Sequence, residues 1–211
     1  MDNGDVISDL DLLRRARQGE WEAFEALVNR LEPRVFAAAM RLLRQRQDAE
    51  DATQQTFLKV MEKLDSFREE ASVATWVLRI ATNHALTMLQ KRRRTRHVPL
   101  EVDSPGNDTE GPLPHPEFIA YWKNDPADLA ERSEVKRMLE SALDELAENY
   151  RIVFTLRDVE QFSTRETAEL LGISESNVKV RLLRARLQLR ERLTRSLGDE
   201  RTRVRPAEHH H

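Results

Sequence analysis

Basic side chains that could contact phosphate lie in two segments of the chain. Between Lys91 and Arg96 every residue except Thr95 is basic, and residues 174–205 hold ten basic and four acidic residues. Between these segments, residues 97–134 hold nine acidic residues and two basic ones. The net charge of -3 therefore hides two cationic zones, a distribution typical of contact with a polyanion at two places. Charge alone fits solvated helix faces equally well.

The residues that could support hydrolysis or bind a metal do not form a site. The densest carboxylates are Asp48, Glu50 and Asp51. On a helix Glu50 lies about 100° from Asp51 around the axis, so the three do not converge on one ion. The histidines before the C-terminal end lack the spacing of metal ligands, and cysteine is absent, which excludes disulfides and thiolate chemistry. The sequence predicts no catalytic residue, no metal site and no cofactor.

The elements that would position the basic residues are helices. Apolar residues recur at three- and four-residue spacing in both halves of the chain, without strand-like alternation. Charged residues make up 34% and aromatic residues 6%, which suits small helical bundles rather than a buried parallel sheet. We predict an all-α protein with a helical N-terminal stretch and helices at about 48–64, 72–94, 133–146, 149–159, 164–171 and 175–197.

A proline-rich, acidic segment divides the chain into two helical domains. Six of the eight prolines lie between Val98 and Pro126. Proline lacks the amide hydrogen and clashes with the preceding turn, so this segment cannot stay helical for long. We predict helical domains at 9–96 and 133–197, an acidic linker at 97–132, and a basic tail at 198–211 whose last residues resemble the remnant of a purification tag.

The linker contains an apolar island at residues 118–122, which would pack against a domain or a partner. No apolar run approaches the roughly 20 residues of a membrane-spanning helix. The acidic N-terminus also lacks the apolar core of a secretory signal. We therefore expect a cytoplasmic protein with no membrane insertion.

The second domain contains the pattern of a helix-turn-helix. Ser163 and Glu166 have the spacing of a capping box, which begins a helix. Gly172 can adopt the left-handed conformation that ends this helix, and Ser174 can cap the next one. Ala168 is small enough to let the two helices approach closely. Together these residues predict a helix-turn-helix.

The second of these helices differs between its two faces. We expect Val178, Leu182, Ala185 and Leu189 to face inward. The opposite face mixes bases and amides with aliphatic side chains. This composition fits a helix in the DNA major groove, where polar groups contact phosphates and base edges and methyl groups contact thymine. A helix buried on both sides is the alternative. The residues expected on the outer face are Ser176, Asn177, Lys179, Val180, Leu183, Arg184 and Leu187.

The first domain contains a helix at residues 48–60 with an acidic and amide-rich strip. The residues expected on its outer side are Asp51, Gln54, Gln55, Leu58 and Glu62, and those expected inside are Ala49, Thr53, Phe57, Val60 and Leu64. A strip with an exposed leucine is typical of a protein-binding surface, although many acidic strips are only solvated.

Several segments together resemble the extracytoplasmic-function (ECF) sigma factors of bacterial RNA polymerase. Residues 48–60 resemble their core-polymerase-binding segment, residues 66–72 and 75–83 their promoter-melting loop and −10-reading helix, and residues 149–160 and 178–186 their −35-binding region 4. The resemblance covers about residues 9–96 and 133–195, in the order of the family. It implies two helical domains, corresponding to sigma regions 2 and 4.

The resemblance also implies partners: core polymerase through its β′ clamp helices and β flap, promoter DNA, and an anti-sigma factor, with a monomeric free protein. The acidic linker would thread toward the polymerase active centre and RNA-exit path. Core polymerase would contact Asp48, Asp51, Gln54, Gln55 and Leu58. The −10 element would contact Phe67, Arg68, Ser72, Trp76, Arg79 and Asn83, with Lys91, Arg92, Arg93 and Arg94 holding phosphates. The resemblance also implies that the outer face of the second helix contacts the −35 element, and it adds Arg165, Arg181 and Arg186 to those contacts.

Two other functions compete with a sigma factor. A helix-turn-helix regulator with a sensor or dimerisation domain explains the second domain but leaves the ordered motifs of the first unexplained. It predicts tight duplex binding without polymerase. An enzyme acting on nucleic acid, such as a nuclease, is disfavoured because the carboxylates do not converge.

Overall fold

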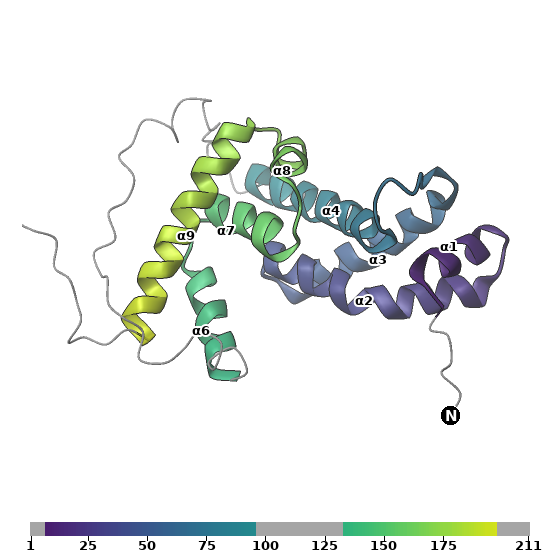
Figure 1. Cartoon of the computed structure of the whole chain (residues 1–211), viewed down its shortest axis with the longest axis horizontal. Coiled ribbons are helices and arrows are strands. Elements are labelled where there is room, and N and C mark those ends of the chain that lie inside the picture. Colours follow the sequence, from purple (N-terminus) through teal and green to yellow (C-terminus); the bar gives the residue numbers. More distant parts are fainter. Residues whose placement is uncertain (1–6, 96–132, 198–211) are drawn as a thin grey trace, which may run out of the picture. The chain divides into compact units, whose positions relative to one another are not determined.

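The chain forms two compact units, residues 1–100 (unit 1) and 101–211 (unit 2). The computed structural model describes residues 7–95 and 133–197. Throughout these residues the secondary structure is helical, which confirms the all-α prediction (Figure 1). None of the described helices is long and apolar enough to cross a membrane. The expected linker with its apolar island, and the expected tail, lie outside the described residues.

Unit 1 is a helical bundle. It contains α1 (Asp9–Arg17), α2 (Trp21–Leu43), α3 (Arg46–Glu62), a 3-10 turn η1 (Leu64–Ser66) and α4 (Val73–Thr95). Helices α2, α3 and α4 each contact the other two, and α1 packs on α2 and also touches η1 and α4. Small side chains at the contacts let the helices approach closely, and buried leucines and valines fill the remaining core. Among the buried residues are Leu13, Leu27, Ala39, Leu43, Ala49, Ala52, Val60, Val77, Ala81 and Ala85.

Local signals fix the ends of these helices. The hydroxyl of Ser8 accepts a hydrogen bond from the amide of Asp11 (3.1 Å) and caps α1. Gly19, with φ +90°, turns the chain between α1 and α2. The hydroxyl of Ser72 accepts a hydrogen bond from the amide of Thr75 (3.1 Å). This cap fixes where α4 begins and where the preceding loop ends.

Unit 2 is built around its long last helix. It contains α6 (Ser133–Asp144), α7 (Glu148–Phe154), a π-helical turn η2 (Thr155–Val159), α8 (Thr164–Leu171) and α9 (Glu175–Leu197). Helix α9 contacts α6, α7 and α8. Two apolar clusters line it, one with Ala142, Leu146, Ala185 and Leu189, the other with Val153, Ala168, Val178 and Leu182. The expected inward face of α9 is therefore confirmed.

The helix-turn-helix has the predicted local chemistry. The amide of Glu166 donates to the Ser163 hydroxyl (3.1 Å), and the amide of Ser163 donates to the Glu166 carboxylate (2.6 Å). Gly172 ends α8 with φ +66°. The Ser174 hydroxyl accepts from the amide of Asn177 (3.2 Å) at the start of α9. These contacts set the angle at which α9 leaves α8.

Candidate functional site

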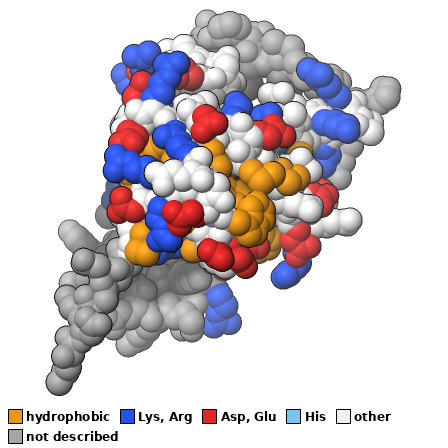
Figure 2. Space-filling model, turned by 90° about the vertical axis from the view of Figure 1, so that its right-hand side faces the viewer, with side chains coloured by type: hydrophobic (Ala, Val, Ile, Leu, Met, Phe, Trp, Pro, Cys, Tyr) orange, Lys and Arg blue, Asp and Glu red, His pale blue; other side chains and the backbone are white. Residues whose placement is uncertain are grey.

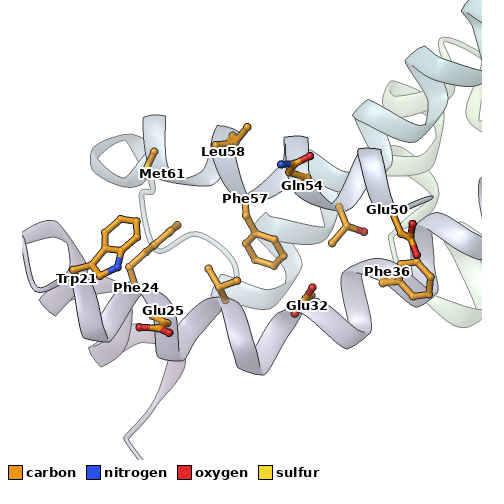
Figure 3. Close-up of a pocket in the computed structure, with 12 residues that line it drawn as sticks. Trp21, Phe24, Glu25, Glu32, Phe36, Glu50, Gln54, Phe57, Leu58 and Met61 are labelled. Carbon is orange, nitrogen blue, oxygen red and sulfur yellow. The ribbon is translucent and has the colours of Figure 1, made fainter. Parts of the chain in front are cut away.

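An apolar groove separates the exposed sides of α2 and α3. It is open, encloses about 530 Å³, and is lined by aromatic and aliphatic side chains with glutamates at its edges (Figure 3). Trp21, Leu58 and Met61 are large apolar residues that remain 63%, 45% and 41% exposed. Figure 2 shows apolar side chains gathered on one face of the molecule among acidic and basic ones. Exposed apolar side chains inside an acidic rim suit an amphipathic helix with basic flanks. The glutamates are Glu25, Glu32 and Glu50.

The expected strip on α3 forms one wall of this groove. Gln54 and Leu58 line it, whereas Asp51 and Gln55 are exposed on the same helix. Phe57 was expected inside, but it is only half-buried, and its ring points into the groove toward α2. The other wall comes from α2 and was missed by the sequence analysis. The signal available in the sequence was Trp21 itself, a large apolar residue at the start of α2.

Asp48 and Arg92 lie against each other although the sequence assigned them to different partners. A guanidinium nitrogen of Arg92 lies 3.5 Å from the Asp48 carboxylate and 3.3 Å from the carbonyl oxygen of Leu43. Both side chains are less than a third exposed. Arg92 thus joins the end of α4 to the α2–α3 connection, whereas Lys91 and Arg93 are exposed. The two residues therefore contact each other within unit 1.

The loop before α4 carries the aromatic residue predicted to meet a base. Phe67 is only 7% exposed, and its ring lies 5.2 Å from that of Trp76 with a 49° tilt. Phe67 therefore offers little surface on which a base could stack, contrary to the −10 contact predicted for it. Arg68 and Ser72 on the same loop are exposed.

Helix α4 places the remaining −10 candidates on one side. Trp76, Arg79 and Asn83 follow at spacings of three and four residues, so they share a helix face. Trp76 and Arg79 are half-buried and Asn83 is exposed, whereas Val77 and Ala81 face the core. An aromatic, a guanidinium and an amide in a row can stack on and hydrogen-bond to unpaired bases.

Helix α9 exposes a narrower strip than the sequence predicted. Ser176, Lys179, Leu183 and Arg186 are exposed, and Val180 and Leu187 are half-buried. The expectation that Asn177 and Arg184 lie on the outer face is wrong, because these residues are 5% and 8% exposed. Arg181, implied as a DNA contact, is 4% exposed.

The physical reason is the width of the buried face of α9. Each of the three buried polar residues immediately precedes a core residue of α9 and so lies at the edge of its buried face. One guanidinium nitrogen of Arg184 lies within 3.4 Å of the Tyr150 hydroxyl on α7. Helix α9 thus packs over nearly half of its circumference.

Two exposed arginines of unit 2 are paired. Arg186 donates two hydrogen bonds to the carboxylate of Asp158 (2.9 and 2.7 Å), a pairing that raises the pKa of its guanidinium above the ordinary value. Arg165 at the start of α8 pairs with Glu169 one turn later (2.9 Å), and both are exposed. Any phosphate that contacts Arg186 must compete with Asp158 or share the guanidinium with it.

Comparisons with known proteins follow the two units. The family models described as Sigma-70 region 2 and Sigma-70, region 4 match residues 27–95 and 136–189. The chain is 33% identical over 183 residues to the ECF RNA polymerase sigma factor SigG of Mycobacterium tuberculosis, covering 82% of this chain and 48% of SigG. It therefore spans about half the length of that relative.

A second relative matches at nearly full length. The chain is 27% identical over 181 residues to the ECF RNA polymerase sigma factor SigW of Bacillus subtilis, covering 86% of this chain and 94% of SigW. Among solved structures, it is similar to the sigma factor RpoE in complex with the anti-sigma factor NepR from Bartonella quintana. That likeness has a TM-score of 0.54 and 26% identity, and covers 81% of this chain and 96% of RpoE.

Proposed function

Because the chain belongs to the extracytoplasmic-function sigma factors of bacterial RNA polymerase, we propose that it directs core polymerase to promoters by contacting their −10 and −35 elements. The observation that carries the proposal is the match of both sigma regions, in family order, to separate units with exposed polar helix faces. Members of this family are not generally enzymes. The role that we propose for this chain is to bind DNA and polymerase in the cytoplasm and to position them, without catalysing a reaction.

Unit 1 binds core polymerase through the groove and the exposed strip of α3. Leu58 and Met61 offer apolar anchors, and the glutamates at the edges attract basic residues that flank a partner helix. Asp51 and Gln55 extend the contact along α3. Asp48 supports this surface indirectly, through its contact with Arg92.

Unit 1 also holds the −10 element. The side of α4 with Trp76, Arg79 and Asn83 accepts unpaired bases of the melted strand. Lys91 and Arg93 lie exposed near the end of the same helix and contact phosphates. This division separates base selection from charge neutralisation.

Unit 2 binds the −35 element as duplex DNA. Ser176, Lys179 and Leu183 occupy the exposed strip of α9 that enters the major groove, beside Val180. Arg165 and Arg186 lie exposed nearby on α8 and α9 and contact phosphates. The buried Asn177, Arg181 and Arg184 stabilise the packing of α9 instead of contacting DNA.

We extend to this chain the partner seen with the similar RpoE. An anti-sigma factor binds it and covers surfaces that polymerase and DNA would otherwise contact. The apolar groove is the part of unit 1 that such a partner would compete for.

Run-off transcription with core polymerase and a genomic promoter library tests the function. We expect transcripts that require the chain, start at defined sites, and are lost in Leu58→Arg and Lys179→Ala. The matched controls are Ala26→Arg and Arg34→Ala, exposed positions of α2 that do not line the groove. Absence of chain-dependent transcripts, with tight duplex binding by the chain alone, would instead establish a helix-turn-helix regulator.

A further inference from the structure

Helix α1 lies outside the region 2 match, which begins at residue 27, but it touches the loop before α4. Arg17, in the last turn of α1, donates one hydrogen bond to the carbonyl oxygen of Leu64 (2.7 Å) and another to that of Phe67 (2.6 Å). One planar guanidinium thus bridges two backbone positions three residues apart. A planar group with fixed donors holds such a geometry better than a flexible amine does.

The same arginine also contacts the aromatic ring of the loop. The guanidinium carbon of Arg17 lies 5.9 Å from the centre of the Phe67 ring, which packs on Trp76. A cation at this distance from an aromatic ring is attracted to it. Arg17 therefore fixes both the backbone and the ring of Phe67, and through the ring it restrains Trp76.

A second arginine of α1 holds the far part of the loop. Arg14 forms a forked contact with the carboxylate of Glu69, at 2.9 and 3.0 Å from one nitrogen and 3.3 Å from another. Glu69 has φ +59°, a left-handed conformation that residues with a side chain rarely adopt. A partner that holds Glu69 favours this conformation over the alternatives open to a free loop.

We propose that α1 is a positioning element for the −10-binding side of α4, with Arg17 and Arg14 as positioning residues that shape its base preference through the loop before α4 and through Trp76. The inference rests on the proposed −10-binding function of unit 1. Neither arginine needs to touch DNA, because each acts through Phe67, Trp76 or Glu69. A binding site held in one geometry discriminates better among similar ligands than one that must be ordered at each encounter.

The test uses the full chain in holoenzyme, on a promoter obtained from the library and then randomised at the −10 element. We expect Arg17→Ala to lower transcription from the duplex promoter. It should also reduce the preference for the favoured −10 base over the others by about tenfold. Hydrogen bonds from a charged group contribute more than neutral ones, and a loss of about 1.4 kcal/mol corresponds to a factor of ten. Arg17→Lys should be intermediate. The control is Arg15→Ala on the same helix, which removes an exposed pair with Glu20 (2.7 Å).

A charge reversal tests the second arginine. Arg14→Glu should reduce the −10 base preference by about twofold, a small effect because exposed ion pairs contribute little. The double variant Arg14→Glu with Glu69→Arg should restore the preference. Affinity for core polymerase and the thermal unfolding midpoint are measured for every variant, so a change in base preference is separated from a loss of fold.

The results distinguish the two proposals. If Arg17→Ala and Arg17→Lys lower the unfolding midpoint but leave the −10 base preference equal to that of Arg15→Ala, α1 is only a structural helix and the inference is wrong. A wild-type chain that gives no polymerase-dependent transcripts would overturn the proposed function, and the inference with it.

Discussion

Replacing Arg184 by alanine should destabilise unit 2 rather than remove a DNA contact. Its side chain is 8% exposed, and one of its guanidinium nitrogens lies within hydrogen-bond reach of the Tyr150 hydroxyl at 3.4 Å. A contact between α9 and α7 is therefore lost in the variant. Lys179, on the exposed strip of the same helix, provides the matched comparison.

The magnitude follows from burial and contact. A hydrogen bond from a charged group contributes about 1.5–3 kcal/mol, and the length of this one favours the lower end. Loss of buried methylenes adds roughly 0.8 kcal/mol each, offset in part because the variant need not bury a charge. A net loss of about 2 kcal/mol corresponds to a fall of roughly 8–16 °C in the unfolding midpoint of a domain of this size. Lys179→Ala should change the free energy of unfolding by less than about 0.5 kcal/mol.

Hydrogen exchange by mass spectrometry on the full chain locates the effect. Arg184→Ala should lose amide protection in peptides from α7 and α9, while peptides from α2 and α3 stay protected. Lys179→Ala should keep the wild-type protection but reduce the salt dependence of holoenzyme binding to the −35 element by about one unit of slope. The reasoning is refuted if Arg184→Ala retains full protection and loses −35 affinity, because Arg184 would then face the DNA.

Three further predictions concern other contacts. Asp158→Asn should weaken the hold on Arg186, and holoenzyme should then bind −35 DNA more tightly and with a steeper salt dependence in fluorescence anisotropy; unchanged affinity would mean that Arg186 does not reach phosphate. Trp21 is 63% exposed, so Trp21→Ala should leave the unfolding midpoint unchanged but weaken core polymerase binding in a pull-down titration. Unchanged binding would mean that polymerase contacts only the α3 wall of the groove. Burial, and then the charges of two nearby lysines, lower the pKa of His84 below its ordinary 6.5, so its stabilising contribution is present above pH 6.5 and is lost as the pH falls toward the lowered value. Urea titrations should therefore show a smaller acid-side loss of stability in His84→Gln, and an identical pH dependence would contradict this.

The sequence alone determined the features that depend on neighbouring residues. The Ser163–Glu166 capping box, the left-handed Gly172 and the cap at Ser174 all formed as predicted. Each depends on groups within a few residues, whose spacing is fixed by the geometry of a helical turn. The inward face of α9 followed from periodicity for the same reason. The domain boundaries and the roles of the site residues remain predictions.

The tertiary structure decided which of the candidate residues are available to a partner. Periodicity gives the centre of a buried face but not its width, which depends on how many helices cover it; that is why Asn177 and Arg184 were misplaced. The groove is lined by residues of both α2 and α3, and Arg92 contacts Asp48 across 44 positions in the chain. Arg17 reaches Phe67 across 50 positions. Contacts at such separations depend on the angles at which whole helices pack, and no local pattern in the sequence records those angles.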